Sequence, residues 1–133
     1  MRILLLGAML ALAALTPAMA ASLSSTAQSG VKTDVAEHSA YNRSCVAQSV
    51  VATITTQPAN GTATTTVQTK TVPPTGRLGG PQSCAGKSMP TAVVYYQSKP
   101  NFRGTDQITY QRINVDNPND RLNGEIEITV TVN

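Results

Sequence analysis

A strict alternation of apolar and polar residues near the C-terminus constrains the fold of this chain most. Four apolar residues alternate there with acidic or threonine side chains: Ile126, Ile128, Val130 and Val132 with Glu127, Thr129 and Thr131. A strand of this kind has one apolar face and one solvated face. Because the apolar face must be covered, the pattern predicts a second sheet packed against it.

Upstream runs rich in Val, Ile, Thr and Tyr are separated by turn residues, and no window has the apolar period of an amphipathic helix. We expect strands near residues 50–54, 62–71, 92–97 and 107–115. The alternation is lost near Arg112 and Ile113, which predicts a β-bulge there. The dipeptide Asn60-Gly61 favours a tight turn and predicts a hairpin between the first two strands. Short strands spaced in this way indicate an all-β sandwich or barrel.

The first 20 residues have the pattern of a cleavable export signal. A basic start precedes an apolar run over 3–15, and small residues stand at Ala18 and Ala20. The run is shorter than the ~20 residues that span a bilayer. We therefore expect cleavage after Ala20, a periplasmic or secreted location and no membrane span in the mature chain. Residues 21–36 are small and polar, which predicts a flexible leader before one domain over 37–133.

The chain has two cysteines, Cys45 and Cys84. In an exported protein an even number of cysteines favours a disulfide. The bond would close a loop of about 40 residues and stabilise the fold by roughly 4 kcal/mol. Two reduced thiols or a metal pair are the alternatives. Because His38 is the only histidine and no CxxC spacing exists, we expect neither a metal nor a cofactor.

Two motifs resemble those of the bacterial immunoglobulin-like, cadherin-like repeat domains. One is the turn sequence over 57–62, and the other places aromatic, proline, glycine and acidic residues at the family's positions: Tyr96, Pro100, Phe102, Gly104, Asp106 and Tyr110. The resemblance implies an immunoglobulin-like antiparallel β-sandwich. Members of this family are commonly units of large surface adhesins, which implies a role in binding or adhesion. This chain contains the domain once.

Within the second motif we expect structural roles. Asp106 lies four residues before Tyr110, a spacing at which the tyrosine hydroxyl can bond to backbone at the corner that enters a strand. Gly104 is expected to supply a positive φ or a close backbone approach, and Phe102 to cap the open end of the core. Asn60 and Gly61 complete this structural set.

The stretch over 72–90 is rich in Pro and Gly and is expected to be a long irregular loop. It carries Arg77 and Lys87 within residues 38–105, which contain six cations and no acid. These two residues are our candidate binding loop for an anionic envelope polysaccharide or another surface protein. The formal net charge of +3 is too small to imply nucleic acid binding. Calcium at the acidic stretch 116–120 is a weaker alternative to a solvated turn.

Three classes of function are compatible with the sequence, and none is catalytic. The chain lacks a histidine paired with a nucleophile and lacks paired carboxylates in an apolar setting, so we expect no enzyme. A non-catalytic exported binding or adhesion module is the leading hypothesis. The alternatives are a pilin-like subunit of a strand-exchanged surface polymer and an envelope-stabilising protein without a small ligand.

Overall fold

The computed structural model describes residues 20–73 and 84–133, which form nine strands and no α-helix. In chain order they are β1 (Ala21–Ala27), β2 (Thr33–His38), β3 (Ala40–Tyr41), β4 (Ala47–Gln48), β5 (Val50–Thr56), β6 (Gly61–Thr71), β7 (Ser88–Ser98), β8 (Gly104–Asn114) and β9 (Gly124–Val132). Apart from Ala20, the expected export signal lies outside the described residues. No helix in the described ranges is long and apolar enough to cross a membrane.

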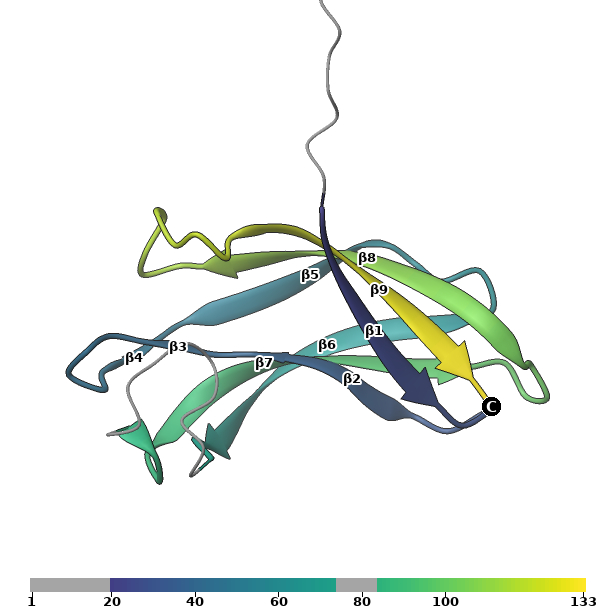
Figure 1. Cartoon of the computed structure of the whole chain (residues 1–133), viewed down its shortest axis with the longest axis horizontal. Coiled ribbons are helices and arrows are strands. Elements are labelled where there is room, and N and C mark those ends of the chain that lie inside the picture. Colours follow the sequence, from purple (N-terminus) through teal and green to yellow (C-terminus); the bar gives the residue numbers. More distant parts are fainter. Residues whose placement is uncertain (1–19, 74–83) are drawn as a thin grey trace, which may run out of the picture.

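Two sheets pack face to face as a sandwich (Figure 1). One has the strand order β1-β9-β8-β5 and the other the order β2-β7-β6, while β3 and β4 form a small separate hairpin. The orders β5-β8-β9 and β2-β7-β6 match strands C-F-G and B-E-D of an immunoglobulin sandwich. All pairings are antiparallel except that β1 runs parallel along β9. The predicted immunoglobulin-like antiparallel sandwich is confirmed.

Inward-facing residues of the two sheets form the main core. All four apolar residues of the predicted C-terminal pattern are buried in β9, and β5 adds Val50 and Ala52. From the opposite sheet, β7 contributes Val94 and Tyr96. With one Phe, four Tyr and no Trp in the chain, the packing depends on Val and Ile side chains, each contributing about 1.5–3 kcal/mol when fully buried. Phe102 packs against this core, as expected.

The flexible leader expected over 21–36 is wrong, because this stretch forms β1 and most of β2. Strand β1 pairs with β9 along its whole length, from Ala21 opposite Ile126 to Ala27 opposite Val132. Its end is fixed by hydrogen bonds of Asn133 with Ala27 and Ser29. An edge strand is held by backbone hydrogen bonds along one side, so small polar side chains are sufficient. The sandwich therefore includes strands within residues 21–36, which the expected boundary at 37 had left out.

The hairpin expected at Asn60-Gly61 is also wrong. Strand β5 pairs with β8, whereas β6 pairs with β7, so the chain crosses here from one sheet to the other. Neither residue has a positive φ. Gly61 is required for a different reason: a Cβ at this position would lie 2.5 Å from the carbonyl oxygen of Gln97. The glycine therefore permits close packing of β6 on β7.

The bulge expected near Arg112 and Ile113 does not occur. Strand β8 keeps its alternation to its end, with Arg112 and Asn114 buried and Ile113 partly exposed. The register shift in this pairing lies in β5 between Ile54 and Thr56. The alternation seemed lost because the last two inward positions of β8 are polar.

The predicted disulfide joins Cys45 to Cys84 and spans 39 residues of sequence. It links the β3–β4 turn to the end of the β6–β7 loop. Around it lies a second small cluster formed by Val72, Cys84 and Met89. Strand β7 begins at Ser88, so the irregular stretch is shorter than the predicted 72–90, and residues 74–83 of it lie outside the described part of the chain.

Candidate functional site

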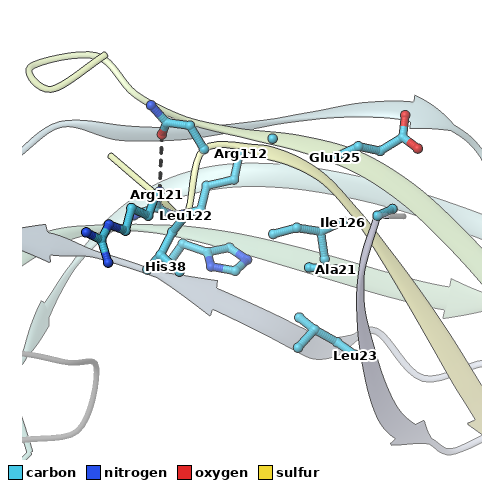
Figure 2. Close-up of a pocket in the computed structure, with 11 residues that line it drawn as sticks. Ala21, Leu23, His38, Arg112, Arg121, Leu122, Glu125 and Ile126 are labelled. Atoms are coloured by element: carbon cyan, nitrogen blue, oxygen red, sulfur yellow. Dashed lines mark hydrogen bonds between the residues drawn. The ribbon is translucent and has the colours of Figure 1, made fainter. Parts of the chain in front are cut away.

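A cavity of about 500 Å³ lies between the two sheets, beside the start of β1 (Figure 2). Its walls come from five places in the fold: the start of β1, the end of β2, Arg112 of β8, the turn before β9 and the first residues of β9. Apolar surface predominates in the lining, to which Ala21, Leu23, Leu122 and Ile126 contribute together with the imidazole of His38.

The sequence of β1 explains why space is left here. Paired residues of parallel strands point to the same side of a sheet, so Ala21 and Leu23 face inward with Ile126 and Ile128. Ala21 is too small to fill the gap between the sheets. Leu23 remains 39% exposed although it faces the interior side of its sheet. The space between the sheets beside the start of β1 is therefore not filled by side chains and remains open.

His38 supplies the polar group inside the cavity. Its Nε2 lies 2.5 Å from the hydroxyl of the buried Tyr110, and the two rings are tilted with centroids 5.5 Å apart. Burial, and secondly the positive charge of Arg112, lower the pKa of His38 to about 4. Burial raises the pKa of Tyr110 above its ordinary value. At neutral pH the pair is therefore uncharged and joined by a hydrogen bond.

Three charged residues line the cavity, and Arg112 is the buried one, with 1% of its surface exposed. Its guanidinium donates from Nη1 and Nη2 to Oδ2 of Asp120 and from Nη1 to Oδ1 of Asn123, all at 3.2 Å. Nε is buried and has no acceptor among the described residues. The Arg112 charge is thus balanced by a neighbouring carboxylate.

Neighbouring groups keep the Asp120 carboxylate ionised beside Arg112. Burial acts to raise its pKa, but hydrogen bonds from the Asn114 side chain and the Leu122 backbone, together with Arg112, bring the pKa below its ordinary value. A carboxylate that remains ionised next to a buried guanidinium satisfies the requirement that a buried charge be paired. The network also fixes the turn that carries Leu122.

Two further charged residues, Arg121 and Glu125, stand at the rim. Both are exposed. In Figure 2 the Glu125 carboxylate points away from His38, and the Arg121 guanidinium extends toward the opposite side. The cavity interior therefore presents apolar surface, a neutral imidazole and a charge that already has its counterion.

The structural motif predicted around Asp106 is present, but its hydrogen bonds differ from the expected ones. Asp106 accepts hydrogen bonds from the backbone of Ala59 and Asn60 and from the hydroxyl of Tyr96. The expected corner bond of Tyr110 to backbone is wrong, since its hydroxyl meets His38. The tyrosine hydroxyl that bonds to Asp106 is that of Tyr96, and not that of Tyr110.

The positive φ expected as one possibility for Gly104 is confirmed, because its φ is +134°. This region is open to glycine and strained for other residues. A Cβ there would lie 3.7 Å from Cζ of Phe102, which is an ordinary contact. Backbone conformation, and not crowding, therefore requires the glycine.

The structure describes only half of the predicted binding loop. Lys87 is exposed, and its backbone bonds to Val72 and Cys84 hold the base of the loop. Arg77 lies outside the described residues. Neither the loop base nor Lys87 lines the cavity.

The acidic stretch considered for calcium has its carboxylates engaged by protein groups. Asp116 accepts a hydrogen bond from the backbone of Ser49 at 2.7 Å, and Asp120 is bound to Arg112. Within residues 20–73 and 84–133, no cluster of three or more His, Cys, Asp or Glu side chains is placed to hold a metal ion.

Sequence reasoning missed His38, Arg112 and Leu122 as site residues. His38 lies two residues after the expected flexible leader over 21–36, and no sequence pattern indicated its burial. A signal for Arg112 was present, because it continues the inward series of Ile108 and Tyr110 at every second position. Leu122 is an apolar residue in a polar turn and is 64% exposed.

Comparison with known proteins gives no relative: no protein-family model, no curated protein and no solved structure matches this chain.

Proposed function

We propose that this protein is a non-catalytic, exported immunoglobulin-like module that binds a component of the cell envelope. The observation that carries the proposal is the open cavity of about 500 Å³ beside the start of β1. Ligand pockets typically measure about 300–1,000 Å³ and combine apolar walls with a few polar groups. The cavity has this size and this kind of lining.

The properties of its polar groups support binding without catalysis. General acid–base catalysis works best with a pKa near the working pH. The pKa of His38 is lowered to about 4, and that of Tyr110 is raised above its ordinary value. Neither group exchanges protons readily near neutrality. Their hydrogen bond instead gives the imidazole a fixed orientation.

Export is supported by the disulfide between Cys45 and Cys84. Such bonds persist in oxidising compartments such as the periplasm or the exterior. The resemblance to bacterial immunoglobulin-like, cadherin-like repeat domains supports a role at the cell surface, although fold analogy alone does not define a ligand. An anionic polysaccharide or another surface protein that meets Lys87 and Arg77 is a further candidate partner.

Export and binding can be tested with protein from its native host. We expect the exported fraction to contain a chain that begins at Ala21 and gains two hydrogens in mass on reduction. Purified protein is then incubated with envelope fragments. We expect retention by the wild type and by Val51→Trp, and loss of retention by Leu23→Trp, which fills the cavity. Unprocessed cytoplasmic protein, or equal retention of all three, would contradict the proposal.

Val51→Trp is the matched control for this design. Leu23 and Val51 lie on β1 and β5, the two edge strands of one sheet, and are 39% and 36% exposed. Only Leu23 lines the cavity. A general effect of a new tryptophan on an edge strand would therefore appear in both variants.

A second candidate, the strand-exchanged polymer, is favoured by one observation. Strand β1 is the first strand of the described residues, forms a sheet edge and has mostly exposed side chains. A copy of β1 from a neighbouring molecule could occupy the same place beside β9. Light scattering tests this idea: heat-treated protein that returns as a concentration-dependent series of oligomers supports exchange, whereas a monomer at all concentrations rejects it.

A further inference from the structure

We infer that the cavity beside β1 binds an uncharged, largely apolar group that presents one hydrogen-bonding atom to the His38 imidazole. This inference rests on the proposed binding function and adds the class of ligand. It depends on three properties of the lining: its apolar surface, its internally balanced charge and its single free ring nitrogen.

The apolar surface comes from opposite sides of the cavity. Leu23 is 39% exposed on β1, and Leu122 is 64% exposed in the turn before β9. Ala21 and Ile126 lie between them along the paired strands. Removing such surface from water is favourable, and a concave wall covers a ligand on several sides at once. A planar or branched hydrocarbon group fits this description.

The balance of charge selects against an ionised ligand. The positive charge of Arg112 is already bonded to the Asp120 carboxylate, and the rim charges of Arg121 and Glu125 point away from the imidazole (Figure 2). An anion or a cation that entered would lose its hydration without gaining a free counterion. An uncharged group does not meet this cost.

The hydrogen-bonding atom follows from the contact between His38 and Tyr110. Nε2 of the imidazole is engaged by the Tyr110 hydroxyl, and Nδ1 has no hydrogen-bond partner among the described residues, so Nδ1 is the nitrogen left for a ligand. A neutral imidazole has one donor nitrogen and one acceptor nitrogen. A ligand with one hydroxyl, amide, amine or carbonyl group can therefore bond to Nδ1.

Two fluorescent probes with the same skeleton test the inference directly. N-phenyl-1-naphthylamine is uncharged and has a single N–H, whereas its 8-sulfonate carries one negative charge. We expect the uncharged probe to bind the wild-type protein at one site per chain. We expect the sulfonate to bind at least about tenfold more weakly, because its charge has no free partner. Equal affinity for the two probes, or no binding of the uncharged probe, would overturn the inference.

Two pairs of variants locate the site. Leu23→Trp fills the cavity and is compared with Val51→Trp. Leu122→Asp places a charge in the wall and is compared with Val115→Asp, because Val115 is 58% exposed in the same β8–β9 connection and is not in the lining. We expect both cavity variants to bind the uncharged probe at least about tenfold more weakly, and both controls to bind it as the wild type does. Equal losses within a pair would overturn the location.

Melting temperatures show whether each variant is folded. If Leu23→Trp fails to fold, Leu122→Asp still tests the site, since its side chain is exposed in a turn. The test is also independent of the envelope experiment. Binding of envelope fragments without binding of the uncharged probe would reject this inference alone, whereas probe binding without envelope binding would reject the proposed function alone.

Discussion

The hydroxyl of Tyr96 donates a hydrogen bond of 2.9 Å to Oδ2 of Asp106, which joins β7 of one sheet to β8 of the other. The same carboxylate accepts hydrogen bonds from the backbone of Ala59 and Asn60. One buried side chain thus ties both sheets to the β5–β6 crossover. This contact replaces the tight hairpin that the sequence suggested at Asn60.

We expect Asp106→Asn to lower the free energy of unfolding by about 2 kcal/mol. The amide cannot accept all of these hydrogen bonds, and buried donors left unsatisfied cost about 1–3 kcal/mol. Urea denaturation measures the change. Asp116→Asn is the control, because Asp116 is exposed and accepts one bond across the sheet end, from the Ser49 backbone. Equal effects of the two substitutions would contradict the role assigned to Asp106.

Tyr110→Phe is expected to cost about 1–2 kcal/mol, because it removes the hydroxyl that bonds to His38. Tyr41→Phe is its counterpart, since the Tyr41 hydroxyl is buried without a partner among the described residues. We expect this second change to be neutral or stabilising. Urea midpoints compare the two, and an unchanged midpoint for Tyr110→Phe would show that the hydrogen bond adds no stability.

Protonation of His38 should make the free energy of unfolding depend on pH. Its pKa is about 4 in the folded protein and 6.5 without the fold, so only the unfolded chain takes up this proton between these values. The contribution of neutral His38 to the free energy of unfolding is therefore fully present above pH 6.5. It is lost as the pH falls toward 4, at up to about 1 kcal/mol per pH unit.

His38→Gln isolates this contribution. Asp34 acts in the opposite direction, because burial and then its neighbour Glu37 raise its pKa to about 6, but it is present in both proteins, so its contribution cancels in the comparison. Unfolding free energies are measured from pH 4 to 7. We expect the wild type to lose more stability than the variant toward pH 4, and parallel curves would exclude a neutral, buried His38.

Removing the disulfide should lower stability without changing the cavity. The bond closes a loop of 39 residues, for which chain entropy predicts about 4 kcal/mol. We expect the double change Cys45→Ala and Cys84→Ala to lower the melting temperature markedly while probe binding at the folded temperature is retained. A loss of probe binding in the folded variant would mean that the disulfide also supports the cavity.

The strands that pack the core could be predicted from the sequence, because burial imposes alternation on them. Strand β9 is the clearest case, with its four inward residues all buried. Strand β1 could not be predicted in this way, since its pairing with β9 uses backbone groups that every sequence shares. Its Ser and Ala content is also typical of disordered segments.

The candidate site escaped prediction for a related reason. Arg112 is buried because Asp120 reaches it from the turn that follows β8, a pairing that depends on tertiary structure. His38 lies next to Tyr110 although 72 residues separate them in the chain. Neither contact leaves a local pattern, whereas the pairing of two cysteines in an exported chain can be predicted from their number alone.

The most direct test of the central claim is an NMR titration of the His38 ring with N-phenyl-1-naphthylamine. His38 is the only histidine in the chain, so its ring carbon–proton signals need no further assignment. We predict that these signals shift and saturate at one probe per chain in the wild type and in Val51→Trp, and that they do not move in Leu23→Trp. Ring signals that stay fixed in the wild type while the probe binds elsewhere would contradict the assignment of this cavity as the binding site.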